Sequence, residues 1–538
     1  MKKITFYITV FIFLIVSFLS CQKLDLTNNT ELTTTAFPKD SAQFVQAAGT
    51  IYAALRGNFS LDYFFMQTLS SDEAILPARG GNWYDNQNYL MLHYHSWTKD
   101  HPWTGSCWGW LSKIIGNTNQ VLSILDANMP SGSNKNTTFA ELKMVRAFAY
   151  FMMMDLYGNV PLDTVYGDFT PHAKVDRPVV FNFIESEIKK CLPYLSSATG
   201  TATYGRPNKY TAYALLAKMY INAEYYTGTQ RYNDCIAACD KIINSGAYVI
   251  EPRATYLQMF YPTNGPSMKE FIFAIPYDAS YTVMPGTNGY MYHARYDVPR
   301  SEKAKFSLPF TPSAPESTLP EFYAYFNDPN DIRNKQWLTG LQYMSDGVTP
   351  VTVKTTKLGY DQFYTGSDGS ASYTYQVNLT PDIILRQNVA TFDCGNDEIA
   401  WNMGYRNIKF YPDNTSTSRN QNNDVPVFRY SDIILMKAEA ILRGGTPTLG
   451  ATALSLVNDL RTNRSTSASW ATVTLDSIYN ERSREFVWET WHRNDMIRFG
   501  KYEGSWGFKT NSDTYRRIFP IPTNALTVNP KLTQNPGY

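Results

Sequence analysis

The sequence carries little charge for its length. Only 18% of its 538 residues are Asp, Glu, Lys or Arg, and the formal net charge is +1. Binding to nucleic acid or another polyanion depends on an excess of Lys and Arg, and this chain has none. We therefore predict no nucleic-acid partner.

Cysteine is also scarce, with six in the whole chain. Five remain if Cys21 is lipidated as argued below, and an odd number cannot form a complete set of disulfides. Cys235 and Cys239 lie four residues apart on a predicted helix, which gives poor disulfide geometry, so we interpret them as small buried apolar residues. No cysteine spacing matches a zinc finger.

Familiar catalytic signatures are missing. The sequence has no Gly-x-Ser-x-Gly, no His-Glu-x-x-His and no glycine loop that would hold a phosphate. His93, His95 and His101 are close together, but their spacing fits no known zinc motif. We favour polar packing for these histidines and predict neither a metal nor a cofactor.

Aromatic residues, by contrast, are abundant, at 15% of the chain, with 39 Tyr. A hydrophobic core does not need so many Tyr, because each hydroxyl requires a partner. A surface rich in Tyr, Trp and Asn and poor in charge suits ligands that are polar, uncharged and flat on one side, as sugars are. Filling a large core is the alternative use of these residues, and composition does not decide between the two.

An apolar run at residues 4–19 follows two lysines at the N-terminus. This pattern is typical of a signal peptide, and the run is short for a membrane span. The Ser-Cys pair that ends at Cys21 resembles a bacterial lipobox, in which the cysteine takes the lipid. We predict a signal peptide over 1–20 and a lipidated tether over 21–38, with ordinary secretion and a chance cysteine as the alternative.

Helical periodicity dominates both ends of the remaining chain. Apolar residues recur at spacings of three and four in many segments, which predicts amphipathic helices. Residues 210–246 and 430–464 each have the pattern of helix, short turn and helix, similar to tetratricopeptide units. The other predicted helices cover residues 41–57, 108–125, 137–158 and 179–195.

The middle of the chain lacks this periodicity. Gly, Pro, Ser, Thr, Asn and Tyr dominate there, which is typical of irregular loops, and loops often carry binding residues. We predict a helical part over 39–250, an irregular loop-rich insertion over 251–425, and a C-terminal helical pair, signature helix and extended strap over 426–538.

Five separate stretches carry the most specific signals. They are residues 70–86 (SSDEAILPARGGNWYDN), 141–162 (ELKMVRAFAYFMMMDLYGNVPL), 425–442 (VPVFRYSDIILMKAEAIL), 481–502 (ERSREFVWETWHRNDMIRFGKY) and 519–538 (FPIPTNALTVNPKLTQNPGY). In this order they resemble the signature segments of the SusD/RagB family of Bacteroidetes outer-membrane lipoproteins. Asn82 stands where that family has an Asp before the Trp.

This resemblance implies a mostly α fold, with four tetratricopeptide-like helix pairs in a curved solenoid and a large irregular subdomain inserted. It implies a surface lipoprotein on the outer membrane that binds an oligo- or polysaccharide and delivers it to a SusC-like TonB-dependent transporter, without catalysis. A peptide- or glycoprotein-binding lid on a similar transporter is one alternative, and a carbohydrate hydrolase or a pure adaptor are weaker ones.

Many charged residues fall inside the signature helices, and paired carboxylates could indicate a glycosidase. Their helical spacing favours structural roles instead. Arg482 with Glu485, and Glu489 with Arg493, can pair along a helix, and buried pairs would clamp helix to helix. The full set is Glu141, Arg146, Glu439, Glu481, Arg482, Glu485, Glu489, Arg493, Asp495 and Arg498.

Loop aromatics are the strongest candidates for glycan contacts, because a flat ring can lie against the C–H face of a sugar while neighbouring polar groups bind its hydroxyls. Trp83 is the strongest single candidate. The predicted glycan-binding set is Arg79, Trp83, Tyr84, Asp85, Asn86, Tyr292, Trp337, Tyr360 and Tyr364, with Asn82, Phe363 and Tyr290 as further candidates, and Tyr290 and Tyr292 are the weaker ones.

The C-terminal stretch cannot extend a helix, because its four prolines lack a backbone N–H. We expect it to lie as an extended strap on the helical scaffold. Its apolar residues, which would be buried there, are Ile518, Phe519, Ile521, Leu526 and Leu532.

Overall fold

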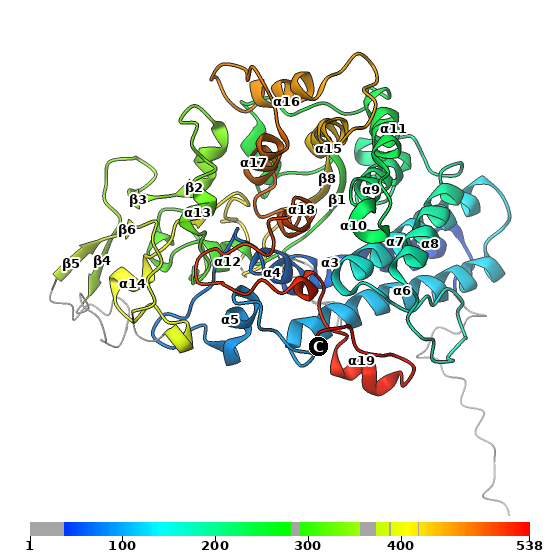
Figure 1. The fold of residues 1–538 in the computed structure, drawn as a ribbon, viewed down its shortest axis with the longest axis horizontal. Helices are drawn as coiled ribbons and strands as arrows, with labels where there is room; N and C mark the ends of the chain where they lie inside the picture. Colours follow the sequence, from blue (N-terminus) through cyan, green and yellow to red (C-terminus); the bar gives the residue numbers. More distant parts are fainter. Residues whose placement is uncertain (1–36, 281–290, 356–372, 387–388, 418) are drawn as a thin grey trace, which may run out of the picture.

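The computed structural model describes residues 37–280, 291–355, 373–386, 389–417 and 419–538. Most of its regular structure is helical, as the sequence predicts, and the strands are short (Figure 1). Among the described residues, no helix combines the length and the apolar composition needed to cross a bilayer.

Three long helices form one side of the molecule. They are α6 (Pro102–Asn128), α7 (Ser133–Tyr157) and α8 (Arg177–Cys191), and α7 packs against both of the others. A proline in the first turn starts α6 and α8, where a missing N–H costs nothing. Gly158, with a φ of 76°, ends α7.

Four more helices continue the stack. Helix α9 (Lys209–Ile221) packs against α11 (Tyr232–Ile243), α11 against α15 (Tyr430–Leu442), and α15 against α16 (Ala453–Thr462). Figure 1 shows this succession from the right of the molecule to its top. Consecutive helix pairs, drawn from two distant parts of the chain, therefore share one scaffold, as a solenoid requires.

The segment between α11 and α15 is built differently. It begins near strand β1 (Phe271–Ile275) and ends with β8 (Val425–Arg429), and these two strands pair antiparallel. The other ladders are also two-stranded: β2 (Trp337–Leu338) with β7 (Arg406–Asn407), β3 (Gly340–Leu341) with β6 (Asn378–Leu379), and β4 (Thr352–Thr355) with β5 (Tyr373–Gln376).

Most of the remaining helices are short, although α2 has 14 residues and α17 has 11. In chain order the other helices are α2 (Ser41–Ala54), α3 (Arg56–Phe59), α4 (Asp62–Thr68), α5 (Asn88–His93), α10 (Ala223–Thr227), α12 (His293–Asp297), α13 (Pro320–Tyr323), α14 (Glu398–Trp401), α17 (Leu475–Glu485), α18 (His492–Arg498) and α19 (Thr523–Val528). Several of them, notably α5, α12 and α14, support the candidate site described below.

The charges of the signature helices are buried and paired between elements, which confirms their structural role. Glu485 accepts from three guanidinium groups, those of Arg333 (3.0 Å), Arg429 (2.8 Å) and Arg464 (2.9 Å). Burial alone would raise the pKa of Glu485, but the arginines outweigh burial and hold that pKa well below its ordinary value.

The pairing along the helix that the spacing predicts is wrong. Arg482 pairs with Asp432 and Asp495 at 2.8 Å each, not with Glu485. Glu489 pairs with Arg429 and Lys409, and it lies outside α17 and α18, so it shares no helix with Arg493. These side chains face neighbouring elements, which supply the closer partners.

The histidines of the His93–His101 stretch have separate partners, as polar packing predicts. The Nε2 of His95 contacts the carbonyl of Ser70 at 3.0 Å, and the Nε2 of His101 contacts that of Asn88 at 3.1 Å. Burial lowers the pKa of His93 to about 3 and that of His101 to about 4. Within the described ranges, no group of three or more His, Cys, Asp or Glu side chains is placed to hold a metal ion.

The C-terminal strap packs onto the scaffold as predicted, but it is not extended throughout, because Thr523–Val528 form the short helix α19, and Ile518 and Leu526 are only half-buried. Phe519 and Ile521 are fully buried, and the backbone N–H of Phe519 donates to the carbonyl of Leu156 at the end of α7 (2.7 Å). The indole of Trp97 donates to the hydroxyl of Tyr538 (2.7 Å). The cysteines that the structure describes, including Cys235 and Cys239, are buried free thiols, as predicted.

Candidate functional site

A tight turn in front of α5 carries Trp83. Gly80 and Gly81 both adopt a positive φ (62° and 80°), and the carboxylate of Asp393 accepts from both of their N–H groups at 2.8 Å. The turn closes with a hydrogen bond from Arg79 N to Asn82 O (2.9 Å). A side chain at Gly80 would collide with Asn396, so glycine is required there.

The turn holds the indole of Trp83 in a cluster of aromatic rings. Its centroid is 5.4 Å from that of Tyr296 and 6.4 Å from that of Tyr89, both edge to face. Trp83 itself is half-buried, while its two neighbours are buried. Burial raises the pKa of Tyr296 to about 12, so this phenol is neutral at physiological pH.

A guanidinium group lies among these rings. The carbon at the centre of the Arg295 guanidinium is 5.6 Å from the Trp83 ring, 5.7 Å from Tyr292 and 5.5 Å from Tyr296. Arg295 is half-buried and forms no ion pair with a described residue, and its Nε is buried without a hydrogen-bond acceptor. We call Trp83, Tyr292, Arg295 and Tyr296 the aromatic cluster.

Arg295 and Tyr296 are absent from the sequence-based prediction. Both belong to α12, whose sequence HARYD follows directly on the predicted Tyr292. The sequence signal that could have identified these two residues is the alternation of Tyr with Arg in a loop-rich segment. This alternation does not reveal that the Trp83 turn, some 200 residues earlier in the chain, packs against the segment.

The predicted residues around Trp83 fall into one surface. Tyr84, Asp85, Asn86 and Asn82 are exposed, and the hydroxyl of Tyr84 accepts from Gln87 Nε2 at 2.6 Å. The structure thus brings the Trp83 turn and Tyr292 together, with polar side chains at the rim.

Two predicted residues are not available to a ligand, which corrects the prediction. Arg79 is fully buried, and its guanidinium donates to the backbone carbonyls of Ala400 and Met403. Trp337 is 6% exposed and packs edge-on against Phe326 and Trp488, with centroids 5.1 and 5.8 Å away. Tyr290, Tyr360, Phe363 and Tyr364 lie outside the described residues.

Chemically, the aromatic cluster offers flat apolar faces next to hydrogen-bond donors and acceptors. The guanidinium of Arg295 supplies donors, and the rim amides and carboxylate supply acceptors. Such a surface suits a ligand with apolar C–H faces and hydroxyl edges.

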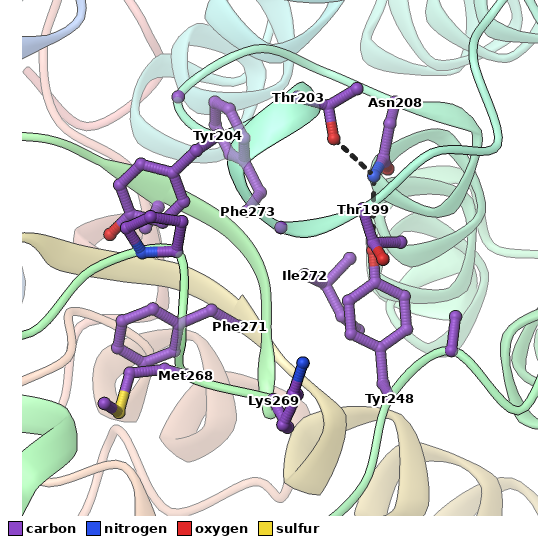
Figure 2. Close-up of a pocket in the computed structure, with 15 residues that line it drawn as sticks. Thr199, Thr203, Tyr204, Asn208, Tyr248, Met268, Lys269, Phe271, Ile272 and Phe273 are labelled. Carbon is purple, nitrogen blue, oxygen red and sulfur yellow. Dashed lines mark hydrogen bonds between the residues drawn. The ribbon is translucent and has the colours of Figure 1, made fainter.

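A separate hollow of about 120 Å³ lies between the start of α9 and strand β1 (Figure 2). Several of its side chains are hydrogen-bonded within the protein: Asn208 Nδ2 donates to Thr203 Oγ1 (3.3 Å) and to the Tyr248 hydroxyl (3.2 Å), and the Tyr204 hydroxyl donates to Asp424 (2.5 Å). Because these groups bond to one another, we interpret this end of the hollow as structural.

A larger and more open hollow, of about 560 Å³, lies among α6, α7 and α8. The guanidinium of Arg146 at its wall is paired with Glu187 and donates to Asn119 (2.5 Å). This charge too is satisfied within the protein.

Comparison with known proteins gives consistent results for the two parts of the chain. Residues 214–538 match the family model described as SusD family, and residues 24–221 match the one described as "Starch-binding associating with outer membrane". The starch-binding protein SusD of Bacteroides thetaiotaomicron is 24% identical over 500 residues, covering 88% of this chain and 86% of that protein.

Solved structures show the same fold. A laminarin-binding SusD-like protein superposes with a TM-score of 0.70 at 20% identity, over 93% of this chain and 100% of the other. The surface glycan-binding protein A of Bacteroides thetaiotaomicron, in complex with laminarihexaose, superposes with a TM-score of 0.69 at 19% identity, over 92% and 99% of the two chains. From the family match across more than half of its length, this chain belongs to the SusD family.

Proposed function

We propose that this protein is a cell-surface lipoprotein that binds a glycan at the aromatic cluster and delivers it to a SusC-like TonB-dependent transporter in the outer membrane. The relatives named above, which bind starch or laminarin, support a glycan as the ligand. The lipid anchor would be attached at Cys21, and the protein would act as a binding protein without catalysis.

The observation that carries the proposal is the aromatic cluster itself. Trp83 and Tyr292 are only half-buried although they lie in a ring-rich environment, and Arg295 beside them has no carboxylate partner among the described residues. Each sugar ring stacked on an aromatic face buries roughly 100 Å², worth about 1 to 3 kcal/mol before ordering costs.

Isothermal calorimetry of the mature protein against laminarin, starch, xylan, mannan and pectin tests the glycan assignment. We expect binding to at least one polymer, and we expect Trp83→Ala to weaken that binding about 10- to 100-fold while the melting temperature stays within about 2 °C of the parent value. Tyr194→Ala is the matched control, because Tyr194 is 51% exposed and lies after α8, outside the cluster. Binding only to peptides or glycopeptides, or release of sugar products, would reject the proposal.

The anchor and the partner need their own tests. Metabolic labelling with a fatty acid should mark the native protein and not Cys21→Ala. Mild detergent extraction of the outer membrane should then co-purify a large β-barrel transporter with the tagged protein, and repeated failure to find one would remove the delivery step from the proposal.

A further inference from the structure

A small polar hollow of about 70 Å³ lies next to α14. It is distinct from the aromatic cluster, and none of its residues is among those predicted to bind a glycan. Its chemically relevant lining residues are Arg300, Ser301, Ser313, Glu398, Trp401 and Asn402.

The hollow contains a buried acceptor without a donor. Glu398 is 2% exposed, and its Oε1 receives no hydrogen bond in the part of the chain that the structure describes. The side chain of Thr355 hydrogen-bonds to the same carboxylate, and burial, as the largest influence, raises the pKa of Glu398. A buried carboxylate oxygen left without a donor is costly, and a ligand donor would remove that cost.

This feature separates the hollow from the other two described above. At the hollow near β1, the hydroxyls and amide are bonded to one another, and at the hollow among α6, α7 and α8 the guanidinium is paired. Glu398 therefore supplies, in the wall of this hollow, a buried acceptor that receives no donor within the described residues.

The hollow is also built onto the same framework as the aromatic cluster. The buried Arg79, which precedes the Trp83 turn, donates to the carbonyl of Ala400 in α14. On the other side, the N–H groups of Ser313 and Ala314, which line the hollow, donate to the carbonyl of Arg295 at 2.9 and 3.1 Å. Figure 1 shows α14 toward the left of the molecule, far from α8 and α11.

Both sites are also linked along the chain. Arg295 of the cluster and Arg300 of the hollow are five residues apart, and the Arg300 guanidinium lies 5.5 Å from the ring of Trp401. The hollow therefore combines an aromatic ring (Trp401), a cation (Arg300) and an acidic acceptor (Glu398). It resembles the aromatic cluster in having a guanidinium next to a ring.

We propose that this hollow is a second saccharide subsite, in which Glu398 accepts a hydrogen bond from a sugar hydroxyl of a chain that also stacks on the aromatic cluster. The inference rests on the proposed function and extends it: the ligand is an oligosaccharide long enough to reach both places. With room for a few atoms rather than a whole ring, the hollow takes the hydroxyl or hydroxymethyl edge of a residue whose ring lies outside.

The test compares short and long probes. Hexasaccharides and the matching disaccharides of laminarin, starch, cellulose, xylan and mannan are titrated by calorimetry into the mature protein, Trp83→Ala and Glu398→Gln. For a hexasaccharide that binds, we expect Glu398→Gln to weaken binding about 10-fold, since hydrogen bonds to charged groups have that order of strength. The disaccharide, held by the aromatic cluster alone, should change less than about 2-fold.

Glu302→Gln is the matched control. Glu302 is also fully buried and lies two residues from Arg300, but it does not line the hollow, so its loss should leave both affinities unchanged. A second readout is the indole ¹⁵N–¹H resonance of Trp401, assigned with Trp401→Phe: it should shift with the hexasaccharide and not with the disaccharide.

Each failure has a distinct meaning. Equal affinities of Glu398→Gln and the parent protein for the hexasaccharide, with a Trp401 resonance that does not move, would overturn the subsite while Trp83-dependent binding keeps the proposed function. If no hexasaccharide binds, the subsite is wrong as stated, and the polymer titrations decide separately whether the proposed function survives.

Discussion

Two regions of this molecule use arginine and aromatic residues in opposite ways. Around Glu485, every guanidinium is matched by carboxylates at 2.8 to 3.0 Å, and all the partners are buried. Around Trp83, the guanidinium of Arg295 lies on three half-buried or buried rings and has no carboxylate partner among the described residues.

The difference separates structure from function. A buried charge network whose members pair with one another fixes the packing of α15, α17 and the strand β8. The aromatic cluster, in contrast, has rings that are partly exposed and a guanidinium without a carboxylate partner among the described residues. A bound ligand would supply these missing partners. Saturation of hydrogen bonds and charges, rather than residue type, therefore distinguishes the two regions.

The largest effect should follow from breaking the complete network. Glu485→Ala leaves Arg333, Arg429 and Arg464 with fewer partners in the interior and should lower the free energy of unfolding by about 3 to 5 kcal/mol. Urea denaturation measures it. Asp476→Asn, which breaks the exposed pair between Asp476 and Lys501 (3.0 Å), should cost less than about 0.5 kcal/mol. Similar losses for both variants would contradict the comparison.

A buried carboxyl beside the network should make stability depend on pH. Burial raises the pKa of Glu73 to about 7, although His492 and Lys409 oppose the shift. Because the folded pKa lies above the unfolded value of 4.5, the folded state binds the proton more tightly, and stability falls as pH rises from about 5 to about 7. Glu73→Gln should remove this loss, on the order of 3 kcal/mol. Identical pH profiles for the two proteins would show that Glu73 does not titrate in this range.

A substitution in the aromatic cluster should lower ligand affinity and leave the stability of the fold almost unchanged. Trp83→Ala should weaken binding of the polymer identified in the calorimetric panel by about 10- to 100-fold, which corresponds to the stacking energy of one ring. The melting temperature should stay within about 2 °C of the parent value, because Trp83 is half-buried. Loss of binding together with a large loss of stability would assign Trp83 to the core.

Replacing the unpaired cation should have a smaller effect. Arg295→Lys keeps the charge but loses the planar group that lies on the rings, so affinity should fall about 3- to 10-fold. Calorimetry at two salt concentrations separates the contributions, since a purely electrostatic role would be restored by Lys and weakened by salt. If Arg295→Lys binds with the parent affinity, stacking of the planar guanidinium does not contribute to binding.

The smallest effect on binding is expected at Trp337, which the sequence alone makes a candidate. Because this ring is 6% exposed and packed against Phe326 and Trp488, Trp337→Phe should change affinity less than about 2-fold while lowering stability by about 1 to 3 kcal/mol. A loss of binding comparable to that of Trp83→Ala would place Trp337 in the site after all.

Prediction from sequence succeeded where the signal is local. Apolar periodicity gave the long helices, glycine and proline composition gave the irregular middle, and the prolines of the terminal stretch gave the strap whose Phe519 is buried. Of the predicted site residues, Trp83 and Tyr292 lie on the same Arg295 guanidinium, although the two segments are far apart in the chain.

It failed where exposure depends on distant segments. Arg79 and Trp83 are four residues apart in one turn, yet the carbonyls of Ala400 in α14 and of Met403 after it bind the buried Arg79, while Trp83 stays partly accessible. The same holds for Arg482 and Glu485, whose closest partners come from elements that adjacent sequence does not identify.

The sequence by itself determined the family, the mostly helical class and the abundance of aromatic residues. Periodicity, turn residues and signature motifs can be recognised from residues that are close together in the chain. Only the tertiary structure decided which rings are buried, which charges are paired within the protein, and which groups are left for a ligand. Burial and pairing depend on the distant segments that the folded chain places against each side chain.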